Sequence, residues 1–383
     1  MPPALPSKYS VELATDRRQD ASFLASWNEF LKDSESEDKI YQTPEFFNFL
    51  LRTSNGKDRM EIYSISSRED GKLVGMVPVR IRSDAFVFQI GTKKLASRQM
   101  RVIGLLGSMP MAPAEPDLAA QIVDYLFQQF HECQALCLSA LPAASVFWNS
   151  LRKSSAMSEN FRTCIIDEWR ECHTIPLFSS FELYLRQFST KKRYNLNRQI
   201  RLLREHGGSL SLHRIRTAAE VHRLTSAIQQ LLPADGRGIF LSEEKCKALA
   251  DLNLLHCYVL ECGQAPAAFI FGTCSRQVLH IHNIMYSSTL PEFSIGTTIL
   301  HLAIEDLCTA FNFSSIDLGY GVPGHTYQSS NVKRERAYVL IFPNTLTNRC
   351  LCWLHDFQDH AIKKAKAGMK NIRRLIKTFR APA

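Results

Sequence analysis

Two histidines alternate with apolar residues in the segment Leu279-His280-Ile281-His282. This alternation predicts a β-strand that carries both imidazoles on the same side. A histidine with an ordinary pKa titrates near neutral pH and can act as a base. The pair could also bind a metal ion, but no third ligand is evident. Polar side chains on a half-exposed strand explain the pattern about equally well.

An aspartate ends a second strand-like segment, Ser315 to Gly319. A carboxylate at a strand end, such as Asp317, can accept a proton from a substrate amine directly or through a water molecule. Tyr320 or Tyr327, which follow it, could protonate a leaving thiolate. The simpler alternatives are an aspartate that caps a turn and tyrosines that serve packing. We expect Asp317, His282 and Tyr320 to be catalytic.

A predicted helix follows the first strand and begins with small residues. Ser294, Gly296, Thr297 and Thr298 precede an apolar run with helical spacing that extends to Leu307. The first N–H groups of a helix have no partner within the helix, and the helix dipole favours an anion at this end. An ordinary capped helix start would look the same. We interpret the four residues as the phosphate-binding corner of an acyltransferase.

Positive charge is concentrated in the segments 191–204 and 363–380, and the whole chain has a net charge of +9. Basic clusters attract nucleotide cofactors, nucleic acids and anionic lipid head groups alike, so charge does not choose among them. In the first segment, Arg193 and Leu196 lie near one stripe of a predicted helix. Part of that helix should therefore pack while Lys191 and its neighbours project outward, as on an ordinary solvated face.

At 383 residues, with 45% hydrophobic residues, the chain suits two globular domains plus extensions. Its first residues lack the apolar core of a secretory signal, and no apolar run approaches the length of a membrane span. The 11 cysteines are scattered and form no C-x-x-C pair. Reduced, mostly buried thiols in a cytoplasmic protein are therefore expected, and no metal site.

Helical and strand patterns alternate along the whole chain. A hairpin is predicted over 60–80, and a second hairpin of the same layout over 256–274, which suggests a duplicated fold. Helices are expected over 20–32, 43–51, 117–131, 147–153, 189–204, 218–231 and 242–252, and further strands over 100–106, 135–141, 161–168, 210–215 and 337–342.

The residues at the start of the second half resemble a known family. The order Phe181-x-x-Tyr184-Leu185-x-x-Phe188-Ser189-x-Lys191-x-Arg193 is similar to the entry segment of CelD-like acetyltransferases. These enzymes are a branch of the GNAT superfamily related to the FemAB-type tandem transferases. The second hairpin, the strand–loop–helix from Tyr286 to Leu300, and the segment Phe313 to Gly321 continue the match in order. Tyr327-Gln328 stands where the family often has Tyr-Lys.

The resemblance implies tandem GNAT-like domains with mixed α/β sheets and a FemAB-like architecture. A degenerate domain is then expected over 1–175 and an acetyltransferase domain over 176–345. Acyl-CoA would be the co-substrate and an amine on a sugar or envelope-polysaccharide precursor the acceptor. The resemblance favours Lys191 and Arg193 as residues near substrate phosphates, and we group His280 and Tyr327 with them as substrate-binding residues.

The tail over 346–383 has the pattern of a basic amphipathic helix, which could dock on the protein or lie on an anionic membrane surface. The protein is therefore expected in the cytoplasm or at the inner face of a membrane, without a nucleic-acid partner. Two alternatives stay open. One is an aminoacyl-tRNA-dependent transferase of the FemAB type, and the other is a non-catalytic basic module that binds nucleic acid or anionic lipid.

Overall fold

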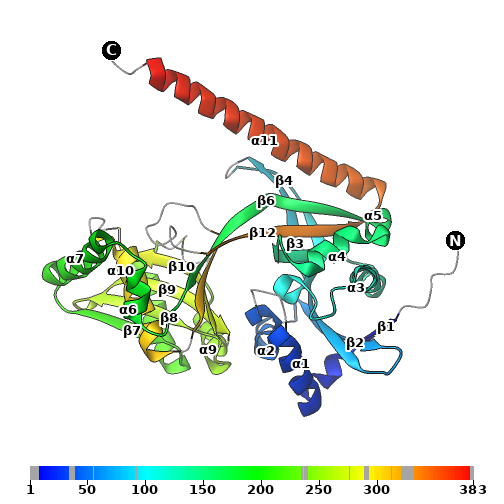
Figure 1. Cartoon of the computed structure of the whole chain (residues 1–383), viewed down its shortest axis with the longest axis horizontal. Helices are drawn as coiled ribbons and strands as arrows, with labels where there is room; N and C mark the ends of the chain where they lie inside the picture. Colours follow the sequence, from blue (N-terminus) through cyan, green and yellow to red (C-terminus); the bar gives the residue numbers. More distant parts are fainter. Residues whose placement is uncertain are drawn as a thin grey trace. The chain divides into compact units, whose positions relative to one another are not determined.

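The computed structural model divides the chain into two compact units (Figure 1). It describes residues 8–33, 39–54, 56–90, 93–233, 236, 240–275, 277–288, 293–311, 313–320 and 332–379. Unit 1 comprises Met1–Asp38, Gly56–Arg170 and Arg336–Ala383, and unit 2 comprises Lys39–Asn55 and Glu171–Glu335. The expected mixed α/β fold class is confirmed.

Unit 1 contains a mixed sheet in the order β1-β2-β3-β4-β5-β12, followed by the first part of β6. Neighbouring strands pair antiparallel from β1 to β4, β4 and β5 run parallel, and β12 pairs antiparallel with β5. The strands are β1 (Tyr9–Leu13), β2 (Arg59–Ser67), β3 (Leu73–Ile90), β4 (Lys93–Leu105), β5 (Ala135–Pro142), β6 (Phe161–Pro176) and β12 (Val332–Pro343).

Helices cover both faces of the unit 1 sheet. Side chains alternate along the strands, so Leu136 and Leu138 join one core while Ala135 and Cys137 join the other. The first core includes residues of α3, α4 and α5, and the second includes Cys352 of α11. The helical segments are η1 (Thr15–Gln19), α1 (Ala21–Asp33), η3 (Leu106–Ser108), α3 (Pro116–Gln129), α4 (Val146–Lys153), α5 (Ser155–Asn160) and α11 (Leu346–Phe379).

In unit 2 the strand order is β6-β11-β10-β9-β8-β7, again with parallel and antiparallel neighbours. Strands β7 to β10 pair antiparallel, β10 and β11 run parallel, and the last part of β6 pairs antiparallel with β11. The strands are β7 (Leu210–Ile215), β8 (Cys257–Cys262), β9 (Ala265–Ser275), β10 (Val278–Tyr286) and β11 (Ser315–Tyr320).

The core on one face of this sheet is formed with α6, α7 and α10. Helix α8 packs on β7, β8 and β9, and α2 packs against α9. Two helices of unit 2 begin where the sequence predicted, each after a residue that caps its first turn. The Thr43 hydroxyl accepts a hydrogen bond from the Phe46 N–H, and the Ser189 hydroxyl accepts one from the Lys192 N–H. The helical segments are η2 (Lys39–Gln42), α2 (Pro44–Thr53), α6 (Phe181–Arg186), α7 (Thr190–Gly207), η4 (Ala218–Glu220), α8 (Val221–Leu231), α9 (Glu243–Asp251) and α10 (Ile295–Ala310).

The two units repeat one topology, which confirms the predicted duplication. In each, four antiparallel strands lead through a helix, α3 or α10, to a parallel fifth strand. In each, the sixth strand comes from a distant part of the chain. Residues 336–343 of β12 complete unit 1, and residues 171–176 of β6 complete unit 2.

The units depart from the expected boundaries in two places. Residues 39–55 belong to unit 2 because η2 packs on β9 and α2 packs on α9. Residues from Arg336 onward belong to unit 1 because β12 pairs with β5. Among the described residues, no helix combines the length and the apolar character needed to cross a bilayer.

Candidate active site

The candidate site lies where two parallel strands of unit 2 stop pairing. Strands β10 and β11 are in register from Val278 and Ser315 up to the pair His280 and Asp317. Directly after this pair, the register between β10 and β9 shifts at residues 281–283 of β10. The register between β11 and β6 shifts at residues 317–320 of β11. The carboxyl ends of parallel strands are the usual place for a ligand in such sheets.

Asp317 and His280 are buried side by side at this point. Their exposed fractions are 4% and 5%, and His280 Nδ1 lies 3.7 Å from Asp317 Oδ2. The other carboxylate oxygen, Oδ1, accepts a hydrogen bond of 2.7 Å from the Gly319 N–H. Gly319 has a φ of +64°, a left-handed conformation that glycine adopts without strain. The turn therefore fixes the orientation of the carboxylate toward His280.

His282 is the extra residue of a β-bulge in β10. The β9–β10 register places His280 opposite Thr273 and Ile281 opposite Gly272, and then passes directly to Asn283 opposite Phe271. The Thr273 hydroxyl also lies 2.8 Å from His282 Nε2. Both imidazoles therefore lie on the Thr273 side of the strand, opposite the core that Ile281 joins. A bulged residue has no partner in the ladder, which makes its backbone N–H a candidate donor for a substrate oxygen.

The protonation of His282 is set by two opposing effects. The surrounding protein lowers the pKa of the imidazole below its ordinary value, and the nearby Asp317 carboxylate raises that pKa in part. His282 nevertheless remains solvent-exposed. A histidine with a lowered pKa is neutral at pH 7, which is the form that accepts a proton.

Two residues beside His280 and His282 were not predicted from the sequence. One is Thr273, whose hydroxyl contacts His282. Tyr41 of η2 is the other, and its ring centre lies 6.2 Å from that of His280. Tyr41 comes from the N-terminal part of the chain, and no local pattern connects it with β10.

The start of α10 offers fewer free donors than expected. The N–H groups of Thr297 and Thr298 both donate to the Ser294 carbonyl, at 2.9 and 3.0 Å. Ser294 itself is left-handed, with a φ of +49°, and its side chain caps nothing. The ring of Tyr286 lies over Gly296, so that a Cβ there would be 2.9 Å from ring carbons. The remaining candidates for anion binding in this turn are the N–H groups of Ile295 and Gly296.

An ion pair and hydrogen bonds fix α10 on the sheet. Asp306 of α10 pairs with Arg214 of β7, with 3.0 Å between Oδ2 and Nε. The Tyr258 hydroxyl of β8 donates to the same carboxylate at 2.8 Å, and His256 Nε2 lies 2.9 Å from that hydroxyl. The helix that follows β10 is thereby held in a defined position.

Lys191 and Arg193 lie on α7, at the end of the helix away from the segment that precedes α10. Both belong to α7, whose Leu196 and Leu203 face the core on the α10 side of the sheet. The segment just before α10 meets the opposite end of α7, where the rings of His206 and Phe293 are 4.8 Å apart. Thirteen residues of helix separate Arg193 from His206, which is roughly 20 Å. Arg193 donates to the Thr190 hydroxyl, and Lys191 is exposed.

The sequence also predicted Tyr320 and Tyr327 as site residues. Tyr320 is the last residue of β11, opposite Cys172 of β6, and the structure describes its backbone. Tyr327 lies outside the described residues.

Part of the chain that contains the candidate site matches a known protein family. Residues 190–329 match the family model described as an acetyltransferase (GNAT) domain. This part of the chain is similar to a GNAT domain. The matched segment contains His280, His282 and Asp317 and covers less than half of the chain. The match does not distinguish the CelD-like branch from other GNAT proteins.

Solved structures extend the similarity of fold to both units. FemX aligns with 86% of this chain and 98% of its own, at a TM-score of 0.58 and 8% identity. A tandem GNAT protein from the clavulanic acid biosynthesis pathway aligns with 88% of this chain and 98% of its own, at a TM-score of 0.53 and 9% identity. At such identities the similarity shows the fold, which is of the tandem GNAT type. No curated protein matches the sequence.

Proposed function

We propose that unit 2 is an N-acyltransferase that moves an acyl group from acyl-CoA to an amine on a sugar or envelope-polysaccharide precursor. The observation that carries the proposal is the buried Asp317–His280 pair at the point where β10 and β11 diverge. The match of residues 190–329 to the GNAT domain supports the type of chemistry.

In this mechanism the amine nitrogen attacks the thioester carbonyl carbon directly, and the C–S bond then breaks. His282, neutral at pH 7, accepts the proton that the amine loses, directly or through water. Asp317 holds and polarises His280 beside it. The His282 N–H at the bulge donates to the developing oxyanion, and Tyr320 protonates the departing thiolate.

The donor's phosphates would lie at the start of α10, against the N–H groups of Ile295 and Gly296. The exposed Tyr286 ring must turn aside from Gly296 to admit them. Lys191 and Arg193 are then candidates for contacts with more distant acceptor groups rather than with the reacting atoms. No metal takes part in the proposed reaction.

The proposal is tested by measuring CoA release from acetyl-CoA with a panel of amino sugars. We expect Asp317→Asn and His282→Ala each to lower kcat by about 100- to 10,000-fold. His222→Ala, which changes an exposed histidine on α8, should keep full activity. Full activity in both site variants would remove the assignment of these residues.

An aminoacyl-tRNA is the second candidate for the donor. The similarity in fold to FemX keeps this candidate open. Thermal-shift measurements with CoA and with charged tRNA separate the two, since a ligand present at 100 times its Kd stabilises the folded state by about 2.7 kcal/mol. A shift with tRNA and none with CoA would replace the first donor by the second.

We also propose that α11 binds an anionic membrane surface. Trp353 and Phe357 lie one turn apart, 63% and 61% exposed, with their rings stacked at 5.6 Å. Lys363 and Lys364 follow on the same helix and are exposed. Exposed aromatic residues next to lysines are the composition that interfacial helices use. The alternative occupants of this surface are a protein partner and nucleic acid.

A further inference from the structure

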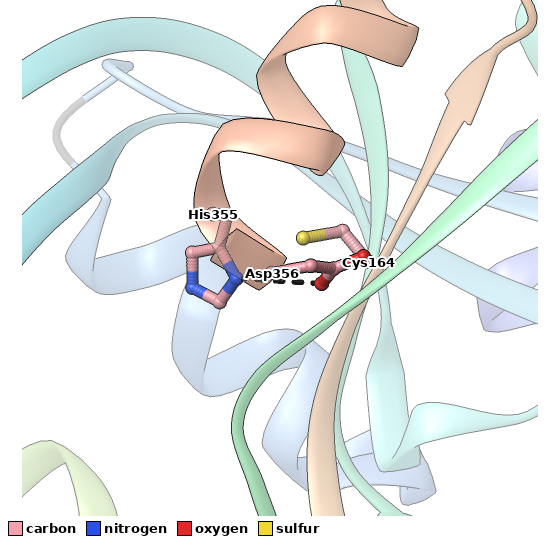
Figure 2. A group of neighbouring side chains, drawn as sticks. All are labelled: Cys164, His355 and Asp356. Carbon is pink, nitrogen blue, oxygen red and sulfur yellow. Dashed lines mark ion pairs between the residues drawn. The ribbon is translucent and has the colours of Figure 1, made fainter. Parts of the chain in front are cut away.

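A second cluster of reactive side chains lies in unit 1 and has no part in the proposed acyl transfer. Cys164 comes from β6, and His355 and Asp356 come from α11. Their sulfur, imidazole nitrogen and carboxylate oxygen all lie within 4.8 Å of one another. Figure 2 shows the three side chains pointing toward a common point.

A fourth potential ligand lies beside this group. Cys352 of α11 belongs to the same buried core as Cys164, although its sulfur is not among the atoms that lie within 4.8 Å of one another. The two cysteines are 1% and 7% exposed, and both are free thiols. Cys352, His355 and Asp356 stand at positions i, i+3 and i+4 of α11, a spacing that places them on one face of a helix.

His355 is the observation that points to a ligand. Its ring is 3% exposed, and its Nδ1 atom makes no hydrogen bond. Carboxylate oxygens of Asp356 and Asp359 lie 3.9 and 3.7 Å from this atom, too far for a hydrogen bond. A buried nitrogen without a partner costs stability, so its position between two carboxylates and a thiol needs a reason.

The spacings suit a metal ion better than direct contacts. Ligand atoms around tetrahedral Zn²⁺ stand about 3.3 to 3.8 Å apart, because each lies about 2.0 to 2.3 Å from the metal. The distance from His355 Nδ1 to Asp359, 3.7 Å, lies within this range, and the distance to Asp356, 3.9 Å, lies just beyond its upper limit. The Phe86 and Phe88 rings flank the imidazole at 5.4 and 6.4 Å and form an apolar shell around it.

We infer that Cys164, His355 and Asp356 bind a Zn²⁺ ion that fastens the start of α11 to β6. Cys352 and Asp359 flank these three ligands, and either one would complete the four-ligand shell of a structural site. Binding releases the Cys164 thiol proton, and this thiolate and the Asp356 carboxylate then balance the charge of the ion. The sequence predicted no metal because a strand and a helix far apart in the chain supply these ligands, without a C-x-x-C pair.

The test measures metal binding by the full-length protein. We expect one equivalent of Zn²⁺ per chain, and Co²⁺ in its place should give the visible absorption of a tetrahedral site with thiolate charge transfer. Cys164→Ser should weaken Zn²⁺ binding by at least about 100-fold in competition with a chelator, more than loss of an outer-shell partner usually does. Cys350→Ser is the matched control, because Cys350 lies on the same helix but is exposed.

A cysteine variant that fails to fold would leave Asp356→Asn as the decisive variant. Its side chain is 73% exposed, so folding should survive, while Zn²⁺ affinity should fall by at least about 10-fold. Equal affinity in the parent and in Asp356→Asn would overturn the site. A Co²⁺ complex without thiolate charge transfer would do so too, as would recovery of a Cys164–Cys352 disulfide from freshly purified protein.

Discussion

At the scale of single residues, the candidate site depends on how Asp317 acts on its two histidines. The carboxylate is held by the Gly319 N–H and faces His280, while its charge also raises the pKa of His282. One substitution therefore changes both the geometry and the protonation of the site.

The pH dependence of acyl transfer should show this coupling. A lowered His282 pKa keeps the imidazole neutral down to pH values below about 6.5, so activity should decline only below that pH. Asp317→Asn removes the charge that raises this pKa. The acid limb of its residual activity should therefore move to lower pH in a kcat profile. Movement to higher pH would show that another group controls the limb.

The sequence identified His280, His282 and Asp317 as candidate site residues, because strand alternation and a strand end are local patterns. It did not predict Tyr41 beside His280, since that contact depends on where a distant segment folds. It also placed phosphate-binding N–H groups at Thr297 and Thr298, which donate to Ser294 instead. The difference arises because the helix already begins at Ile295, so the Thr298 N–H makes its first i→i−4 bond and the Thr297 N–H makes an i→i−3 bond.

At the scale of elements, close backbone packing constrains the middle strands of each sheet. A Cβ at Gly272 of β9 would lie 2.7 Å from the His256 carbonyl oxygen and 3.1 Å from that of His280. These are backbone atoms, which cannot move aside as a side chain can.

Gly272→Ala should therefore lower the free energy of unfolding by about 1 to 3 kcal/mol, the usual cost of overpacking. Chemical denaturation followed by circular dichroism measures the change. Gly104→Ala on β4 is the matched control. Its Cβ would meet only the Arg80 carbonyl oxygen, at 3.4 Å, and its effect should be smaller. Equal effects would show that strand glycine as such, and not the close approach, sets the cost.

Acid should weaken the packing of α10. Burial lowers the pKa of His301, which is 2% exposed, to about 4. Below the unfolded pKa of about 6.5 the unfolded chain therefore binds more protons, and stability falls as pH decreases until about pH 4. The slope from this residue is up to about 1.4 kcal/mol per pH unit. His301→Phe should flatten the pH dependence of the thermal midpoint, whereas His222→Ala should leave it unchanged.

Helices and strands were largely predictable because their apolar periodicity is local. The hairpins β2–β3 and β8–β9 and the basic helix α7 appear where the patterns placed them. No strand was predicted at β1, and β3 runs ten residues beyond its predicted end at Arg80. Half-buried polar residues such as Arg82 and Asp84 interrupt the apolar pattern there, and pairing with β4 sustains the strand.

At the scale of the whole molecule, α11 has a buried face and an exposed face, for which we propose different roles. Its buried face carries Cys352 and His355, and its exposed face carries Trp353 and Phe357. A helix that only packed on the protein would not need the second set.

Binding to vesicles tests the exposed face. We expect the protein to sediment with phosphatidylglycerol vesicles and not with phosphatidylcholine vesicles, and high salt should release it. Lys364→Glu should weaken the binding by at least about fivefold, which corresponds to about 1 kcal/mol per basic residue. Trp353→Ala should weaken it as well, whereas Leu13→Ala, a similarly exposed apolar residue on β1, should not. Equal sedimentation with both lipids would contradict the proposal.

The arrangement of the halves was predictable only in outline. A repeated hairpin suggested duplication, but the assignment of residues 39–55 and of β12 depends on contacts between segments far apart in the chain. Such contacts leave no periodic signal in one sequence.

Strands β6 and β12, which complete units 2 and 1 from distant parts of the chain, limit where the protein can be cut into fragments that fold. A cut at the predicted boundary, between residues 175 and 176, would leave the first fragment without the strand that covers β5. The second fragment would lose all but the last residue of the strand that covers β11. Each fragment would then expose an open sheet edge, which favours aggregation. Each half of this duplicated fold therefore needs a strand from the other part of the chain. A single cut of the chain cannot yield either half as a complete domain.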